Sequence, residues 1–93
     1  MLQATAATRS PRAGKLRELG VYTLPERGEY VVSTVYSDGC CLYRKYAWDM
    51  HGEAEFWIDA RGRLLRRGEP TRWSERDLKD TGRTTHYPKP VIT

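Results

Sequence analysis

Short apolar runs separated by Gly, Pro and Asp are the dominant pattern along the chain. Residues 21–24, 29–37 and 40–48 are such runs, and the second of them contains the segment YVVSTVY, which is almost wholly β-branched or aromatic. Side chains of these kinds suit a pleated, half-buried surface. We therefore predict a strand in each run, with the most clearly marked strand at residues 29–37.

Turn residues join these runs. Pro25-Glu26-Arg27-Gly28 follows the first run, and a Pro that fixes φ with a Gly that tolerates positive φ predicts a turn there. Asp38-Gly39 lies between the next two runs and predicts a type I′ hairpin. On the second strand of that hairpin we expect the core to take the more apolar face, which carries Cys40, Leu42, Arg44, Tyr46 and Trp48.

A second hairpin is predicted further along the chain. Phe56 and Ile58 alternate with polar residues, which predicts a strand with these two side chains in the core. Asp59-Ala60-Arg61-Gly62 is typical of a type I turn that ends in a glycine bulge, so residues 63–67 can return antiparallel. Residues 68–70 then break the chain before a last short strand at residues 71–73.

Two short helical segments are expected beside the strands. Residues 15–19 predict one helical turn that Gly20 stops. Ser74 and Asp77 have the spacing of a capping box, so one or two helical turns should follow, with Leu78 facing inward and Gly82 at their end.

The predicted elements define a mainly β fold of five to six short strands with one short helix near the C-terminal end. Such a chain builds a small antiparallel meander or closes into an SH3-like or OB-like barrel. The alternative is an open sheet that completes itself as a homodimer. We expect one β domain over residues 20–82, a mobile basic tail at residues 1–19, with residues 1–14 unstructured, and an extended or mobile arm at residues 83–93. The likeness to SH3-like barrels is one of strand count and turn placement, and it implies no activity.

Composition agrees with a small folded domain. The chain has 93 residues, of which 39% are hydrophobic and 11% aromatic, enough to form one modest core. No apolar stretch approaches the roughly 20 residues that span a bilayer, and no secretory signal begins the chain, so we expect a cytoplasmic protein without a membrane partner. The first 17 residues contain no acid, so an organellar transit peptide is the alternative.

The net charge of +4 is unevenly distributed. Residues 1–20 contribute +3, residues 21–60 contribute −4 and residues 61–93 contribute +5. This pattern indicates an acidic middle that attracts the basic ends or a basic partner, and a basic last third that can meet an anion.

The strongest candidate site is a group of arginines on the second hairpin and the strand beside it, with aromatic residues close by in the predicted sheet. Guanidinium groups match phosphate and carboxylate geometry, and aromatic rings stack on bases. The pattern predicts a non-enzymatic binding or adaptor domain whose anionic partner is a nucleic acid or an acidic protein. The competing interpretation is that the arginines keep the sheet soluble while the aromatics form the core. The candidate binding residues are Arg61, Arg63, Arg66, Arg67, Arg72, Trp57, Trp73 and Tyr43.

The acidic middle supports a different function class. Asp49, Glu53, Glu55 and Asp59 surround one apolar strand, where they can form half of a cross-strand salt-bridge face. The alternative is a docking face for a basic protein or for the protein's own tail. The alternative function is thus a protein–protein interaction or inhibitor module, homodimeric or not, that uses this acidic region or an open sheet edge.

Catalytic candidates are few. Asp49 could orient His51 as a base, with Cys41 as a nucleophile, but no motif surrounds them. The adjacent Cys40 and Cys41 cannot form an unstrained disulfide, and the cysteines and histidines, His86 included, lack the spacing of a metal site. We therefore predict no cofactor and no metal, and an enzymatic function is not favoured.

Overall fold

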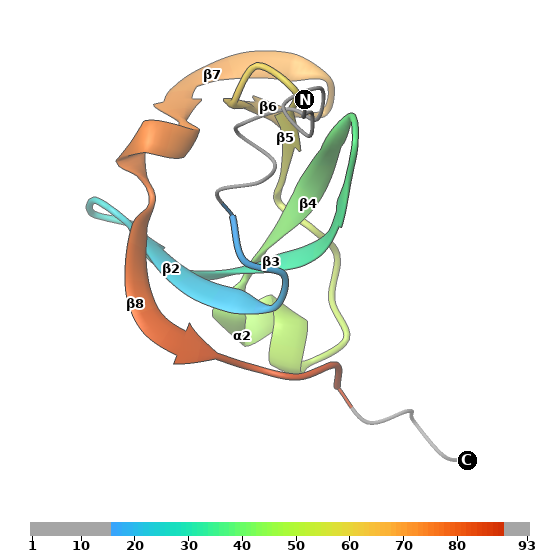
Figure 1. Cartoon of the computed structure of the whole chain (residues 1–93), viewed down its shortest axis with the longest axis vertical. Helices are drawn as coiled ribbons and strands as arrows, with labels where there is room; N and C mark the ends of the chain where they lie inside the picture. The colour runs from blue at the N-terminus through green and yellow to red at the C-terminus, as the bar shows by residue number, and fades with distance from the viewer. Residues whose placement is uncertain (1–15, 89–93) are drawn as a thin grey trace, which may run out of the picture.

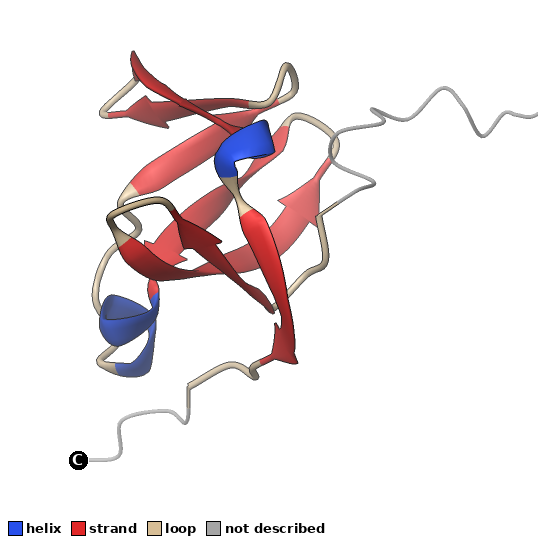
Figure 2. Ribbon diagram, turned by 90° about the vertical axis from the view of Figure 1, so that its left-hand side faces the viewer, coloured by secondary structure: helices blue, strands red, loops and turns tan. Residues whose placement is uncertain are grey.

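A computed structural model describes residues 16–88, which form a curled antiparallel sheet with two short helical segments (Figures 1 and 2). The predicted tail at residues 1–14 and the last residues, 89–93, lie outside the described part. The elements are β2 (Gly20–Leu24), β3 (Gly28–Tyr36), β4 (Gly39–Arg44), α2 (Lys45–Asp49), β5 (Phe56–Asp59), β6 (Arg63–Arg66), β7 (Glu69–Ser74), the 3-10 helix η1 (Glu75–Asp77) and β8 (Lys79–Thr84).

The seven strands belong to one sheet in the order β7-β6-β5-β4-β3-β2-β8, and every neighbouring pair is antiparallel. The mainly β prediction is confirmed, with seven strands instead of five or six. The sheet is open, not a closed barrel, and β7 and β8 form its two edges. These edge strands follow each other in sequence, and η1 carries the chain from one to the other across the curl of the sheet (Figure 1).

The inner face of the curled sheet holds the main core. Phe56 and Ile58 are buried there as predicted, and Cys40 and Leu42 of β4 join them. Trp73 and Leu78, on either side of η1, are partly buried and pack against the same core, as the inward placement of Leu78 predicted. The buried members are Leu16, Tyr22, Leu24, Tyr30, Val32, Cys40, Leu42, Phe56, Ile58 and Leu64.

The β3–β4 hairpin is present, but its turn is not the predicted type I′. Tyr36 pairs with Gly39, so the two loop residues are Ser37 and Asp38, and neither has the positive φ that a type I′ turn requires. Gly39 is instead the first residue of β4, with φ +141°. A Cβ at this position would collide with the Ile58 carbonyl oxygen and meet the Trp57 ring at 2.8 Å, so the glycine is needed for close approach to β5.

A type I′ geometry does occur in the β6–β7 hairpin. Arg67 (φ +55°) and Gly68 (φ +81°) form the two-residue loop between β6 and β7, and Arg66 pairs with Glu69 across it. The break predicted at residues 68–70 is confirmed only at Gly68, because β7 begins at Glu69 and includes the strand predicted at residues 71–73. Pro70 is tolerated because β7 is an edge strand.

The turn between β5 and β6 agrees with the prediction. The Gly62 amide donates to the Asp59 carbonyl at 2.9 Å, and Gly62 has φ +84°. The Asp59 side chain closes the turn, because its Oδ1 accepts the backbone N–H groups of Arg61 and Arg63, each at 2.9 Å.

The strand predicted over residues 40–48 is wrong in its second half, where α2 replaces it. Tyr46, assigned to the core face, is 72% exposed, whereas Trp48 is buried in a second cluster with Val21 and Val31 on the outer face of the sheet. Alternation along residues 40–48 suggested a strand. The helical turn prevails because it brings Trp48 back against Val21 and Val31.

The capping box is present, since the Ser74 amide donates to Asp77 Oδ2 at 2.8 Å. The helix is nevertheless a single 3-10 turn, and β8 pairs with β2 where a second helical turn was predicted. Gly82 accordingly lies inside β8. Residues 16–19 form a turn instead of a helical turn, because Leu19 has φ +65° and its amide donates to the carbonyl of Val32.

Candidate functional site

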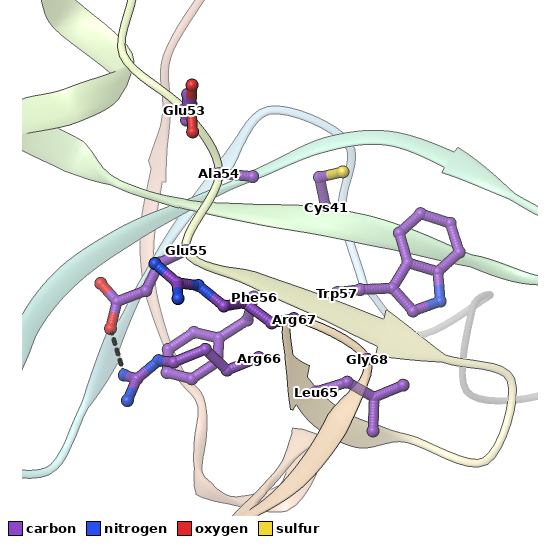
Figure 3. Close-up of a pocket in the computed structure, with 10 residues that line it drawn as sticks. All are labelled: Cys41, Glu53, Ala54, Glu55, Phe56, Trp57, Leu65, Arg66, Arg67 and Gly68. Atoms are coloured by element: carbon purple, nitrogen blue, oxygen red, sulfur yellow. Dashed lines mark hydrogen bonds and ion pairs between the residues drawn. The ribbon is translucent and has the colours of Figure 1, made fainter.

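A groove of about 550 Å³ lies over β4, β5 and β6 on the outer face of the sheet (Figure 3). Cys41, Trp57 and Leu65 form its apolar floor. Cys41 pairs with Trp57, and Trp57 pairs with Leu65, so the three side chains are cross-strand neighbours on one face. Trp57 is only partly buried, which leaves part of its indole ring open to a ligand.

Two of the predicted arginines reach this groove. Arg66 and Arg67 extend toward its Glu55 end, while the Trp57 ring lies at the opposite end (Figure 3). Arg66 Nη2 donates to Glu55 Oε2 at 2.7 Å. The side chain of Arg67 forms no hydrogen bond or ion pair within residues 16–88, so its charge is available to a partner.

The other predicted residues are dispersed. Arg63 forms an ion pair with Asp59 at 2.9 Å, and the guanidinium of Arg72 lies 4.5 Å from the centre of the Trp73 ring, which itself packs against the core. Arg61 is exposed at the β5–β6 turn. The five arginines therefore do not form one patch, and only Arg66 and Arg67 share the groove with Trp57.

Tyr43 faces a second groove, of about 420 Å³, that meets the first at Cys41. Its ring lies 5.0 Å from that of Trp48, with the two planes 72° apart. The chain after β8 closes one side of this groove: Trp48 Nε1 donates to the His86 carbonyl at 2.9 Å, and the Tyr87 hydroxyl lies 2.6 Å from Thr34 Oγ1. Residues 85–88 are thus an extended arm that docks on the domain.

Glu55, which was predicted to belong to the acidic salt-bridge or docking face, has four polar partners. Glu55 accepts hydrogen bonds from Arg27 Nη2 at 2.5 Å, Arg66 Nη2 at 2.7 Å and the Tyr30 hydroxyl at 3.2 Å, and Arg44 Nε lies 3.4 Å from its Oε1. Partial burial acts to raise the pKa of Glu55, but the hydrogen bonds from Arg66 and Arg27 outweigh it, so this pKa lies below its ordinary value. The sequence feature that could have indicated this network is Arg44, a charged residue on the predicted core face of its strand, which needs an acidic partner there.

Two other acids of the same stretch form ion pairs. Asp49 pairs with Lys45 at 2.7 Å one helical turn away, and Asp59 pairs with Arg63. Glu53 lines the first groove without an ion pair among the described residues. Asp49 and Asp59 therefore stabilise a helical turn and a β-turn, and only Glu55 pairs with arginines of other strands and turns, as the predicted cross-strand salt-bridge face requires.

Among the described residues, no hydrogen bond connects the groups considered for catalysis, Asp49, His51 and Cys41. Burial raises the pKa of the Cys40 thiol to about 12 and also raises the pKa of Cys41, so both thiols stay protonated at neutral pH. His51 lines the second groove, and no hydrogen bond links it to Asp49 or Cys41 in the described residues.

The described part of the chain was also compared with the requirements of a metal site and of a membrane-spanning helix. Across residues 16–88, no group of three or more His, Cys, Asp or Glu side chains is placed to hold a metal ion. In that stretch, no helix has the length and apolar character needed to cross a membrane.

A scan against protein-family models and searches of curated proteins and of solved structures found no match to this chain. The class that the fold and the site define is therefore a structural one: a small, open, curled antiparallel sheet with an aromatic groove that has arginines at one end.

Proposed function

We propose that this protein is a non-enzymatic binding module for an anionic partner, and that the partner is single-stranded nucleic acid. The observation that carries the proposal is the groove in which Trp57 lies at one end and Arg67, whose side chain has no partner among residues 16–88, lies beside Arg66 at the other. A groove with a planar aromatic ring at one end and guanidinium groups at the other can hold a base and a phosphate of one strand.

The two ends of the groove would play different roles. The open part of the Trp57 ring, supported by Leu65, offers a stacking surface for a base. Stacking on an aromatic side chain contributes about 1–3 kcal/mol per base and tolerates any sequence. The guanidinium of Arg67 would then bind the phosphate backbone.

The backbone at Arg67 supports a role for this side chain. Arg67 occupies a φ of +55° in a type I′ loop, a position where Asn, Asp or Gly is favoured. A non-glycine residue in this region costs about 1 kcal/mol or more. An arginine kept at a strained position, with no partner in the described residues, is better explained by binding than by stability.

Local placement, not total charge, would drive this binding. Residues 16–88 contain twelve Lys and Arg and twelve Asp and Glu, so the net charge of +4 comes from residues 1–15 and 89–93. We expect few phosphates to be neutralised by the groove and hence a shallow salt dependence, with a slope of about −0.7 for each phosphate contacted.

The competing proposal is a protein-interaction module that uses the acidic middle or an open sheet edge, as a homodimer or with another protein. The two edge strands favour binding through the groove on the sheet face over binding through a sheet edge. β7 carries Pro70 and charged residues, and β8 is charged and pairs with β2 through a bulge, all of which hinder edge-to-edge pairing. We further propose, on strand order and the position of η1 alone, that the sheet is an SH3-like barrel left open between β7 and β8.

The test is fluorescence anisotropy with a labelled mixed-sequence oligonucleotide at low salt. Trp57→Ala should weaken binding about tenfold or more through lost stacking. Arg67→Asn should weaken binding while it stabilises the fold by about 0.5–1 kcal/mol, because Asn tolerates positive φ. Because Arg67→Asn should lower the affinity and raise the stability, a loss of binding cannot be attributed to misfolding. The matched control is Arg76→Asn, at an exposed arginine on η1.

The proposal fails if neither single-stranded DNA nor RNA binds at about 100 µM protein and low salt, the weak end of non-specific binding. It also fails if Trp57→Ala and Arg67→Asn bind like the control. A mass by light scattering that rises with concentration, lost when Glu53 is reversed to Lys, would favour the competing proposal.

A further inference from the structure

Three guanidinium groups converge on one carboxylate at the end of the groove. Arg27 from the β2–β3 turn, Arg44 from the end of β4 and Arg66 from β6 all contact Glu55. Arg27 Nη2 and Arg66 Nη2 bond the same oxygen, Oε2, so these two guanidiniums lie side by side. Arg67 extends to the same end of the groove (Figure 3).

Charge at this point is not balanced. The three guanidiniums carry three positive charges against one negative charge from Glu55, which leaves an excess of two before Arg67 is considered. The side chains of Arg27 and Arg44 are only 29% and 39% exposed, so water screens this excess less well than it would on an open surface. Like charges held together in this way favour a bound anion.

Unused donors remain on all three arginines. Arg27 uses Nε for the Tyr30 hydroxyl and Nη2 for Glu55, and Arg44 uses Nη1 for the Arg27 carbonyl and Nε for Glu55. Within residues 16–88, Nη1 of Arg27, Nη2 of Arg44, and both Nε and Nη1 of Arg66 have no partner. A tetrahedral anion with several acceptor oxygens could use donors from more than one guanidinium.

Aromatic rings hold the arginines in place. The guanidinium carbons of Arg66 and Arg27 lie 4.9 Å and 5.9 Å from the centre of the Phe56 ring, and that of Arg44 lies 5.2 Å from the centre of the Tyr30 ring. Both rings are buried in the core. Pre-organised guanidiniums lose less side-chain entropy when they bind a ligand.

We propose that Arg27, Arg44 and Arg66 form a binding site for a doubly charged phosphate group, with Glu55 as the internal carboxylate that holds them together. The ligand class is a phosphate monoester or inorganic phosphate, whose two charges match the local excess. The site shares Glu55 and Arg66 with the end of the Trp57 groove, but Arg27 and Arg44 lie outside that groove, so phosphate can bind here whether or not the groove binds nucleic acid.

The test titrates inorganic phosphate into the full chain at pH 7.5 and constant ionic strength, with NMR of the arginine Nε–H groups as the readout. We expect the Nε–H signals of Arg27, Arg44 and Arg66 to shift with a common Kd of about 1 mM, a weak affinity suited to a small ligand. Arg44→Gln should weaken binding about tenfold, the effect of one charge-assisted hydrogen bond. Arg76→Gln should leave it unchanged.

A second variant tests the charge argument in the opposite direction. Glu55→Gln raises the local excess from two to three, so phosphate should bind more tightly, by about threefold to tenfold. Should this variant unfold, Arg66→Gln replaces it, with the same weakening expected as for Arg44→Gln.

The site is refuted if the three Nε–H signals do not move at about 50 mM phosphate, far above the expected Kd. It is equally refuted if Arg44→Gln and Arg66→Gln bind phosphate like the wild type. An oligonucleotide carrying a 5′-phosphate and its unphosphorylated form extend the test: binding of either, without any response to inorganic phosphate, supports the Trp57 groove and overturns the phosphate site. A response to inorganic phosphate without binding of either oligonucleotide supports the phosphate site and overturns nucleic-acid binding in the Trp57 groove.

Discussion

Gly39 provides the sharpest test of the sheet geometry. With φ +141°, its backbone lies in a region that is essentially restricted to glycine, and a residue with a side chain there is strained by about 1–3 kcal/mol. A Cβ would also collide with the Ile58 carbonyl oxygen and meet the Trp57 ring at 2.8 Å. Overpacking of this kind adds about 1–3 kcal/mol. We therefore expect Gly39→Ala to lower the free energy of unfolding by about 2–6 kcal/mol.

That loss is large for a fold of this size. The 73 described residues, at about 0.05–0.15 kcal/mol each, give a total stability of about 4–11 kcal/mol. The assay is urea unfolding followed by tryptophan fluorescence, with the midpoint and the slope both fitted. Gly68→Ala is the matched control, because Gly68 has φ +81° but nothing within 4 Å of an added Cβ. Equal losses for the two variants would refute the close approach of Gly39 to β5.

Three further predictions test other parts of the fold. Cys40→Ser places a hydroxyl among buried apolar side chains and should lower the free energy of unfolding in urea by about 1–3 kcal/mol. Cys41→Ser, at a half-buried site, should lower it by less than about 1 kcal/mol. Equal losses would contradict the assignment of Cys40 to the core face of β4 and Cys41 to the opposite face. The pKa of Glu55 is lowered in the folded state, so its contribution is complete above the unfolded-state pKa of about 4.3 and is lost as pH falls through the folded-state value. The stability difference between wild type and Glu55→Gln should thus be greatest near neutral pH and shrink below about pH 4.3, and a difference unchanged between pH 7 and pH 3 would show that the network does not stabilise the fold. Trp48→Phe removes the hydrogen bond to the His86 carbonyl, so limited proteolysis should cut residues 85–88 several-fold faster, and an unchanged cleavage rate would mean that this bond does not hold the arm.

Local chemistry was sufficient wherever a turn or an alternating strand depends on its own residues. The Asp59–Gly62 turn closes through the Asp59 side chain and a positive φ at Gly62, and both residues belong to the four-residue pattern that predicted the turn. Phe56 and Ile58 face the core because alternation places them on one side of β5. The Ser74–Asp77 capping box likewise forms from residues three apart.

Local patterns misled where a distant partner decides the structure. The alternation of residues 40–48 continues past Arg44, but Trp48 finds its contacts with Val21 and Val31 on strands far away in sequence, and α2 forms to reach them. β8 exists because β2 offers it a pairing edge, which no property of residues 79–84 could indicate.

The candidate site divides in the same way. The sequence by itself determined that arginines and aromatic residues gather on the β5–β6–β7 hairpins, because adjacent hairpin strands must lie side by side. Only the tertiary structure decided which of them meet, since the curl of the sheet brings Arg27 and Arg44 to Glu55, 28 and 11 residues away, and draws Arg66 into their network. Charges so far apart in sequence interact only after the sheet has folded, so their convergence is a property of the fold and not of any local pattern.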